Sequence, residues 1–301
     1  MKATVVICTY NRSNFLQKAI SSLQNQDFPL DQYEIVIVDN NSSDNTKEVV
    51  NDFIKDSPVK ISYIPEKRQG LSFARNTGVD NSSGEIVAFM DDDAEAERQW
   101  LASLAELFNN PKVAAAGGPV KPIWHGTKPA WLSEKWIPYL SIREYKELSG
   151  RKTFTDGTYP IGTNMSFRKN VLIEVGQFPV ILGRRGEDLT SNEEIAVCQK
   201  IKARGWKLGF SPEAIVHHHI RDDRLHKEWF YKRAYWQGKS DVVISEESLF
   251  KNIFNFFIWV GVIIKNYLQA TVSNERASFS SKVMVSLFRG KVSQLLTQLR
   301  N

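Results

Sequence analysis

The chain has 301 residues, of which 42% are hydrophobic and 24% are charged, and its formal net charge is +5. This length is enough for one large α/β domain and an appendage. Its two cysteines, Cys8 and Cys198, provide neither a disulfide framework nor a metal-binding spacing. No stretch resembles a signal peptide, because the first predicted strand already begins at Ala3. The expectation is therefore a cytoplasmic protein in a reducing compartment.

The first half of the chain alternates predicted strands with predicted helices. The β-branched residues 4–9 predict a strand, and a helix follows it with Asn11 or Ser13 placed as its cap. A second strand is predicted over 34–38 and a third over 59–64, with a second helix between them. Strands that alternate with helices in this way form a parallel sheet, so the sequence predicts an α/β fold.

Three consecutive aspartates follow the next predicted strand. Residues 69–78 predict a short helix with glycines at both ends, and the apolar strand 86–90 then runs directly into residues 91–93. Open α/β sheets bind their ligands at the carboxyl ends of parallel strands. Three like charges held together require a cation or a hydrogen-bond network, and a nucleotide phosphate bound through a divalent metal supplies such a cation. The alternative is the acidic N-terminus of a helix, since residues 94–108 have a helical pattern.

Four segments of this half resemble the successive signatures of family 2 glycosyltransferases. They are Cys-Thr-Tyr-Asn-Arg at 8–12, Val-Asp-Asn-Asn-Ser-Ser-Asp at 38–44, Gly-Leu-Ser-Phe-Ala-Arg-Asn at 70–76 and Phe-Met-Asp-Asp-Asp at 89–93. The resemblance extends from about residue 3 to about residue 240. It implies a GT-A fold, which is a Rossmann-like, mostly parallel central sheet flanked by helices. It also implies a nucleotide-sugar donor, a divalent cation and inversion at the anomeric carbon.

The resemblance assigns donor-binding roles to side chains near the strand ends. Thr9 and Tyr10 are expected to form part of the base pocket, with Arg12 of the same signature at the donor. Asp39 is expected to accept a hydrogen bond from the imide N–H of the base. This bond favours uracil or thymine over adenine, because a wrong base leaves a buried carboxylate unpaired. Arg75 is expected to close over the base or the diphosphate; alternatively, it is a surface arginine on a short amphipathic helix.

The same resemblance places the metal at the aspartate triplet. Asp93 is expected to bind Mn²⁺ or Mg²⁺ directly, Asp92 to hydrogen-bond the ribose, and Asp91 to support the metal or its waters. The ion would bridge the two phosphates and assist departure of the nucleoside diphosphate. In residues 211–219 the family histidine falls on His218, which is expected to complete the metal shell or contact the diphosphate. In an extended chain its two histidine neighbours face the other way. Alternatively, all three histidines are simple polar residues at a strand end.

Two acidic pairs compete for the role of general base. Glu187 and Asp188 look like the acidic pair of the family. That pair, however, opens a helix that runs about twelve residues to a glycine, and Glu187 lies eighteen positions before Gly205. Glu193 lies twelve positions before Gly205 and begins a helical pattern, whose dipole stabilises a carboxylate. Glu194 is therefore the predicted base, which takes the proton of the acceptor hydroxyl. The alternatives are that the two glutamates merely cap a helix, or that Asp188 is the base.

Two further segments are expected to meet the sugar or the acceptor. Residues 162–168 resemble another family segment, a glycine turn before a helix that starts near Lys169, and Asn164 within it is expected at the donor. Alternatively, this segment only turns the chain. Residues 117–156 are rich in tryptophan and proline, and we interpret them as the acceptor loop, although tryptophans are more often plain packing residues.

The positive charge is concentrated at the C-terminal end. Residues 224–301 contain twelve lysines or arginines and five acidic residues. The apolar run 253–264 is shorter than the ~20 residues that span a bilayer, and residues 280–299 predict a basic amphipathic helix. We expect this tail to dock on the anionic inner face of a membrane. The alternative is a helical pair packed on the catalytic domain or at a homo-oligomer interface. Nucleic-acid binding is not expected, because bulky aliphatic residues interrupt the basic ones.

Together these expectations describe an inverting glycosyltransferase. A GT-A domain is expected over 1–222, with a nucleotide-sugar-binding half at 1–116 and an acceptor-binding half at 117–222, followed by a helical extension at 223–301. The donor is expected to be a UDP-sugar. The acceptor is expected to be a saccharide or lipid-linked saccharide of cell-surface polysaccharide or glycoconjugate biosynthesis. Three alternatives remain: a catalytically silent nucleotide-sugar-binding protein, a basic membrane-scaffold protein, and a sugar-phosphate nucleotidyltransferase, although residues 8–12 lack the glycines of a phosphate loop.

Overall fold

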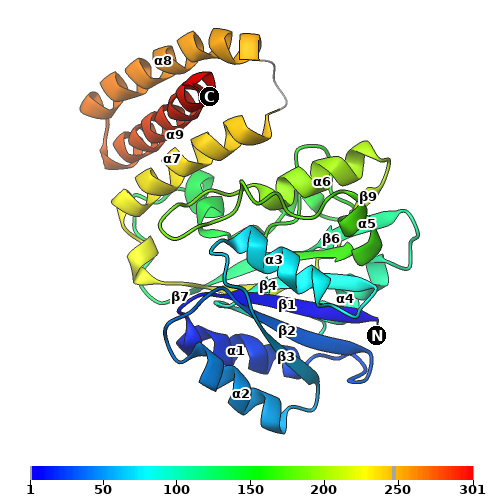
Figure 1. Ribbon diagram of the computed structural model, residues 1–301. Coiled ribbons are helices and arrows are strands. Elements are labelled where there is room, and N and C mark those ends of the chain that lie inside the picture. The colour runs from blue at the N-terminus through cyan, green and yellow to red at the C-terminus, as the bar shows by residue number, and fades with distance from the viewer. Residues whose placement is uncertain (1, 246–248, 301) are drawn as a thin grey trace. The chain divides into compact units, whose positions relative to one another are not determined.

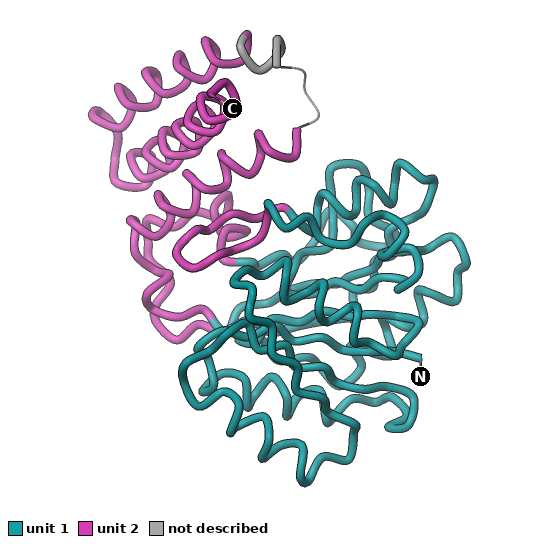
Figure 2. The backbone as a smooth tube through the Cα atoms, viewed as in Figure 1, with its two compact units in different colours: residues 1–123, 141–181, 193–219 teal, residues 124–140, 182–192, 220–301 magenta. Residues whose placement is uncertain are grey.

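The computed structural model describes residues 2–245 and 249–300, excluding the side chains of residues 249–253. The chain forms two compact units, which Figure 2 shows in different colours. Unit 1 contains residues 1–123, 141–181 and 193–219, and unit 2 contains residues 124–140, 182–192 and 220–301. Two segments that precede residue 193 therefore belong to the same unit as the C-terminal helices.

A seven-stranded sheet forms the centre of unit 1, with the strand order β3-β2-β1-β4-β8-β6-β9 (Figure 1). Its strands are β1 (Ala3–Thr9), β2 (Tyr33–Asp39), β3 (Lys60–Pro65), β4 (Ile86–Asp91), β6 (Val113–Gly117), β8 (Asn164–Arg168) and β9 (Lys207–Phe210). The first four strands in the chain pair in parallel, as do β6 and β9, whereas β8 is antiparallel to both of its neighbours. The predicted mostly parallel α/β sheet is confirmed.

Helices cover both faces of this sheet. One face packs against α1 (Ser13–Gln24), α2 (Thr46–Asp56) and α4 (Trp100–Leu107). The other face packs against α3 (Leu71–Asp80), α5 (Lys169–Glu174) and α6 (Glu193–Ala203). Successive residues of a strand point to opposite faces, so Val5 belongs to the first core and Val6 to the second. Strands β1 and β2 are buried on both faces. Polar side chains that are to reach a ligand therefore have to lie at the ends of these strands.

A second, three-stranded sheet corrects the prediction of a helix over 94–108. It has the order β5-β10-β7 and consists of β5 (Ala94–Ala96), β10 (Val216–Ile220) and β7 (Val120–Trp124). Because β5 pairs with β10 in an antiparallel register, helix α4 begins only at Trp100. The aspartates are therefore not at a helix N-terminus, and that alternative is wrong.

Two other local predictions differ from the structure. Gly78 does not end α3, which continues to Asp80, and a Cβ at Gly78 would overlap a methyl group of Val6. The glycine thus permits close packing of the helix on β1. Neither Asn11 nor Ser13 caps α1 with its side chain. Asn11 has a left-handed backbone with a φ of 52°.

The segment 162–168 is mostly a strand and not only a turn. Residues from Asn164 onward form β8, and helix α5 begins at Lys169 as predicted. In the sheet, β8 lies between β4 and β6. A short 3-10 helix, Lys146–Leu148, also belongs to this unit.

In its described residues, unit 2 contains three long helices and two 3-10 helices. They are α7 (Lys227–Ile244), α8 (Leu249–Val272), α9 (Glu275–Arg300), Glu134–Leu140 and Asp222–Arg224. Helix α9 packs against both α7 and α8. A Cβ at Gly238 would overlap the carbonyl oxygen of Leu287, and one at Gly290 would overlap that of Tyr235. The backbones of α7 and α9 therefore touch where these two glycines face each other.

Two tryptophans of the predicted acceptor loop pack inside unit 2. The ring centroid of Trp131 lies 4.5 Å from that of Phe279 and 5.6 Å from that of Phe230. Trp136 donates a hydrogen bond from Nε1 to Ser280 Oγ at 3.1 Å. For these two residues the structure shows the plain packing role.

The amphipathic helix predicted over 280–299 is confirmed as part of α9. The apolar run 253–264 lies in α8, although the side chain of Ile253 lies outside the described residues. No helix in the described part of the chain combines the length and the apolar character needed to cross a membrane.

Candidate active site

Three aspartates stand where β4 ends at the edge of the main sheet. Asp91 closes β4, opposite Cys8 of the parallel strand β1, and its side chain is 30% exposed. Asp92 and Asp93 lie in the turn to β5 and are buried. The carboxylates therefore lie at the carboxyl end of parallel strands, where α/β sheets bind ligands.

Three side chains that can bind a metal come together at this edge. One ligand atom each from Asp91, Asp93 and His218 lies within 4.8 Å of the others. His218 is buried in β10, and its Nε2 atom is 3.1 Å from Asp93 Oδ1. Two carboxylates and one imidazole suit a divalent cation such as Mn²⁺. The donor set therefore fits the cation that the sequence predicts.

The neighbouring histidines point to the other side of β10. His217 Nε2 lies 2.9 Å from Glu97 Oε1, and His219 Nε2 lies 2.7 Å from Glu95 Oε1. This alternation is that of an extended strand and confirms the predicted orientation. His218 is thus the one histidine of the three that faces the aspartates in the described structure.

Arg12 compensates part of the buried negative charge. Its Nη1 atom donates to Asp92 Oδ1 at 2.8 Å and to Asp93 Oδ2 at 2.9 Å. Attraction by Asp92 raises the pKa of Arg12. Burial raises the pKa of Asp92, while Arg12 acts in the opposite direction. In this structure Arg12 contacts the aspartates, and its contact with the donor stays a prediction.

Arg75 links the aspartates to helix α6. Its side chain is only 3% exposed, so the alternative of a surface arginine is wrong. Nη1 donates a hydrogen bond to Glu193 Oε1, and Nη2 lies 3.8 Å from Asp91 Oδ1. Burial lowers the pKa of Arg75, but the nearby carboxylates Glu193 and Asp91 raise it by more. The absence of a side chain at Gly162 leaves room for the guanidinium group.

The ionised site has more negative than positive charges. Three aspartates and Glu193 carry four negative charges, and Arg12 and Arg75 carry two positive charges. A divalent cation would balance this difference. Buried charges are costly unless they are paired, which gives the cluster a reason to bind such an ion.

The segment around Asn164 supports the site from β8. Thr163 donates a hydrogen bond from Oγ1 to Asp91 Oδ2 at 2.6 Å. The Asn164 amide accepts from Trp100 Nε1 at 2.9 Å and donates to the carbonyl oxygens of Pro119 at 3.0 Å and Ala214 at 2.7 Å. These bonds use both amide hydrogens to hold β8 in place. The contact of Asn164 with the donor stays a prediction.

At the end of β2, Asp39 is held in a fixed orientation. Its Oδ1 atom accepts from the Ser42 backbone N–H at 2.8 Å, and its Oδ2 atom accepts from Tyr63 Oη at 2.6 Å. Asn40 donates to the carbonyl oxygens of Glu66 and Arg68 and accepts from the Gly70 N–H. Asn40 therefore connects the end of β2 to the start of α3.

The first two signatures also connect to each other. Asn11 Oδ1 accepts from the Ser43 backbone N–H at 2.8 Å. Thr9 is buried at the end of β1, and Tyr10 beside it is 43% exposed. The ends of β1 and β2 are thus joined where the sequence predicts the base pocket.

The two candidate acidic pairs lie in different surroundings. Helix α6 begins at Glu193, as predicted; Glu193 is buried, and Glu194 is partly exposed. Glu187 and Asp188 are exposed and belong to unit 2, where Glu187 Oε2 lies 3.1 Å from Lys232 Nζ. Of these four acids, Glu193 is the one that pairs with Arg75 of the aspartate cluster in the described structure.

Among the supporting residues, Asn40, Tyr63 and Thr163 contribute side-chain hydrogen bonds that sequence reasoning did not anticipate. Asn40 lies inside the signature 38–44, and Thr163 lies in the segment 162–168 that also resembles the family. Their positions in these segments could have indicated that they support the site. Tyr63 lies in β3, and only the pairing of β3 with β2 brings it to Asp39.

Known proteins that are similar to this chain in sequence or in fold are glycosyltransferases. The glucosyl-dolichyl phosphate glucuronosyltransferase of Haloferax volcanii is 30% identical over 250 residues, which cover 81% of this chain and 77% of that protein. The mannosyltransferase PcManGT from Pyrobaculum calidifontis, solved with GDP-Man and Mn²⁺, superposes with a TM-score of 0.63 at 19% identity, covering 99% of this chain and 85% of that one. S. aureus TarS 1-349 with UDP gives a TM-score of 0.56 at 16% identity, covering 99% and 92%. At these identities the two structures show a shared GT-A fold.

The sequence model of the family described as Glycosyl transferase family 2 matches residues 4–176, more than half of the chain. The match includes the four signatures and the aspartate cluster. The chain therefore belongs to glycosyltransferase family 2.

Proposed function

We propose that this protein transfers a sugar from a UDP-sugar to the hydroxyl group of a saccharide or lipid-linked saccharide, with inversion at the anomeric carbon. The observation that carries the proposal is the convergence of Asp91, Asp93 and His218 at the end of β4. Arg12 on the aspartates and Arg75 between Asp91 and Glu193 join this cluster to the helix of the proposed base.

The donor would bind at the carboxyl ends of β1, β2 and β4. Thr9 and Tyr10 would border the base, and Asp39 would accept its imide N–H. The bonds from Ser42 and Tyr63 orient the Asp39 carboxylate in advance, which lowers the cost of ordering it on binding. Asp92 would hydrogen-bond the ribose. Arg12 would contact the donor, and Arg75 would close over the base or the diphosphate, while both stay paired with carboxylates of the site.

Asp93, Asp91 and His218 would hold Mn²⁺ or Mg²⁺. When bound, this ion supplies Lewis-acid stabilisation of the departing nucleoside diphosphate. Thr163 keeps the Asp91 carboxylate in place through its 2.6 Å hydrogen bond. The solved mannosyltransferase with GDP-Man and Mn²⁺ supports the proposal by its similar fold.

Glu194 would act as the general base at the N-terminus of α6. Its carboxylate would take the proton from the acceptor hydroxyl as that oxygen attacks C1 from the face opposite the diphosphate. The new C1–O bond forms while the bond from C1 to the diphosphate oxygen breaks, which inverts the configuration. Glu193 is paired with Arg75 and would position the helix.

A relative supports the proposed acceptor class, and the charge distribution supports the proposed membrane contact. The 30% identical relative is named for action on a glucosyl-dolichyl phosphate, which supports a lipid-linked acceptor for this chain. We assign donor binding to residues 1–116, acceptor binding to 117–222 and peripheral contact with an anionic membrane to 223–301. The surplus of positive charge in residues 224–301 supports the last assignment.

Calorimetric titration with UDP, with and without Mn²⁺, tests the donor site. The wild type should bind UDP only when Mn²⁺ is present. Asp93→Ala should weaken this Mn²⁺-dependent binding by more than about a hundredfold. Asp52→Ala is the matched control, because Asp52 is an exposed aspartate on α2. If UDP, TDP and GDP all fail to bind the wild type, the proposal is wrong.

Turnover separates an enzyme from a catalytically silent binding protein. UDP-sugars should be tested on saccharide and prenyl-linked saccharide acceptors, with released UDP as the readout. Metal-dependent UDP binding without turnover on any acceptor would favour the silent protein. Inversion is tested by NMR analysis of the anomeric configuration of the product.

A further inference from the structure

Helix α8 presents an apolar stripe to solvent. Six large apolar side chains lie on one helical face and are half or more exposed: Phe254, Phe257, Ile258, Ile264, Leu268 and Val272. Phe257 is 71% exposed and Val272 86% exposed. At about 100° per residue, these six positions fall within an arc of about 120° on one side of the helix. Monomeric soluble proteins rarely expose such a continuous apolar surface without a partner.

This stripe is a second apolar face of α8, distinct from the face that packs in the bundle. Trp259 lies on the packed face and forms a small core with Val242 of α7 and Leu295 of α9. The apolar residues Phe279 and Val283 of α9 are also buried. The amphipathic helix expected at the membrane thus uses its apolar side for packing inside unit 2, and α8 is the helix with an apolar side still exposed.

The charge around the stripe favours an anionic lipid surface over a second copy of the chain. Residues 249–300 contain seven lysines or arginines and a single acidic residue, Glu275. Lys265 lies within the stripe, and its aliphatic stem can reach past apolar neighbours to the phosphate level of a bilayer. Two copies joined face to face would bring these like charges together, whereas anionic lipids would compensate them.

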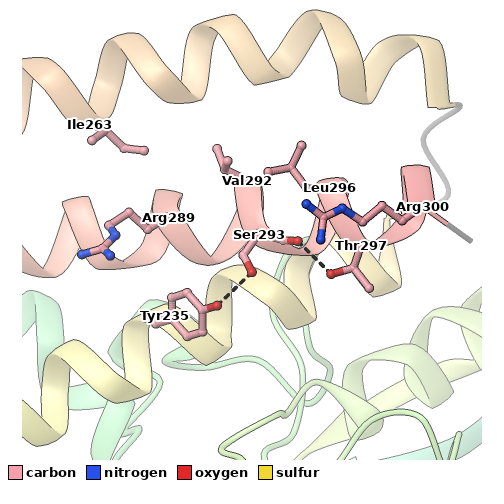
Figure 3. Close-up of a pocket in the computed structure, with 8 residues that line it drawn as sticks. All are labelled: Tyr235, Ile263, Arg289, Val292, Ser293, Leu296, Thr297 and Arg300. Carbon is pink, nitrogen blue, oxygen red and sulfur yellow. Dashed lines mark hydrogen bonds between the residues drawn. The ribbon is translucent and has the colours of Figure 1, made fainter.

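A groove of about 410 Å³ lies beside α8 and adds to this argument (Figure 3). Ile263 of α8 and Leu296 of α9 give it an apolar part, and Ser293 contributes a hydroxyl group. Arg289 and Arg300 line it as well, and neither pairs with a carboxylate of the described residues. Guanidinium groups beside a hydroxyl and apolar side chains match the phosphate and the upper chain of a lipid.

We propose that α8 lies in the plane of an anionic bilayer, with its stripe in the boundary between headgroups and acyl chains. This inference rests on the proposed membrane contact and names the surface that makes it. The hydrophobic part of binding comes from α8, while Arg289 and Arg300 of α9 provide attraction for lipid phosphates. A contact of this kind persists in part at high salt, unlike a purely electrostatic one.

Flotation with vesicles of phosphatidylglycerol and phosphatidylcholine in equal parts tests the proposal on the full chain. Phe257→Gln and Leu268→Gln should each lower the partition coefficient about tenfold, because each removes a buried apolar side chain from the lipid contact. Ile181→Gln is the matched control and should leave binding unchanged, since Ile181 is 71% exposed and lies in unit 1. Thermal unfolding and UDP titration of the same samples should match the wild type.

Two further measurements separate the electrostatic from the hydrophobic contribution to vesicle binding. Arg289→Gln with Arg300→Gln should reduce the preference for anionic over pure phosphatidylcholine vesicles several-fold, and part of the wild-type binding should persist in 1 M salt.

Wild-type binding that neither α8 variant weakens would overturn the assignment to α8 but leave the membrane contact standing. No wild-type binding to either vesicle would overturn both, while UDP titration would still report on the donor site. Loss of a dimer in the α8 variants, without a change in lipid binding, would assign the stripe to a second copy instead.

Discussion

The two compact units place charged and apolar side chains in opposite ways. Unit 1 buries charge: Asp93 is 1% exposed, and Arg75 is 3% exposed. Unit 2 exposes large apolar groups on α8, such as Phe257. Both arrangements cost free energy in the isolated protein, since buried charges lose hydration and exposed apolar groups order water. Each cost is a reason to expect a ligand or partner at that place.

The units differ in how much of this cost the protein itself compensates. In unit 1, Arg12 neutralises part of the aspartate charge, and Arg75 pairs with Glu193. In unit 2 the inner face of α8 is covered by α9, but the outer stripe remains exposed in the described structure. In the proposed function, the active site is therefore largely arranged before its ligands bind, whereas the proposed docking surface depends on its partner.

The largest expected effect concerns unit 1 and is the loss of turnover when the proposed base is replaced. Glu194→Gln should lower kcat by about a thousandfold, because the acceptor hydroxyl loses its proton acceptor. UDP binding should remain as in the wild type. Steady-state kinetics and calorimetry on the same preparations measure the two quantities.

Asp188→Asn is the matched control for that experiment, since Asp188 is exposed and lies in unit 2. Its kcat should stay within about twofold of the wild type. If this variant loses turnover while Glu194→Gln keeps it, the base is Asp188. The catalytic groups would then not be confined to unit 1.

The Arg75–Glu193 pair tests whether buried charge in unit 1 is compensated internally. Arg75→Leu should lower the free energy of unfolding by about 3–5 kcal/mol, because it leaves Glu193 buried without its cation. The double variant Arg75→Leu with Glu193→Leu should recover most of this stability but not the activity. Denaturant unfolding and kinetics of the single and double variants measure both. Equal stability of the single and double variants would contradict the pairing.

The contact between α7 and α9 gives a smaller effect and tests the packing of unit 2. Gly290→Ala should destabilise the protein by about 1–3 kcal/mol, because the added Cβ would overlap the Tyr235 carbonyl oxygen. Gly261→Ala is the control, since a Cβ added at Gly261 of α8 would meet no atom of the described residues outside its own helix backbone within 4 Å. It should stabilise its helix by up to about 1 kcal/mol. Thermal unfolding of the two variants should shift in opposite directions. Stabilisation by Gly290→Ala as large as that by Gly261→Ala would show that α7 and α9 do not touch there.

Much of the fold could be predicted because its signals are local. The β-branched and apolar runs of β1, β2 and β4 predict strands, and their alternation with helices predicts a parallel sheet. The antiparallel insertion of β8 was not predicted, since five residues have too little pattern to show which strand they pair with. Three-residue β5 was mistaken for the start of a helix for the same reason.

The site was predictable where its residues end recognisable elements. Asp91 follows an apolar strand, and Glu193 begins an amphipathic helix at a set distance from Gly205. The supporting contacts were not predictable, because they join distant parts of the chain. Thr163 reaches Asp91 across 72 positions, and Arg75 reaches Glu193 across 118.

The sequence by itself determined the alternation of strands and helices up to β4, the place of the three aspartates and the basic character of the C-terminal helices. Tertiary structure decided that His218 turns toward Asp93, that Arg12 and Arg75 are committed to carboxylates, and that α8 carries the exposed apolar face. The physical reason is that periodicity and caps act over a few residues. The orientation and burial of a side chain depend on which distant segment packs against it.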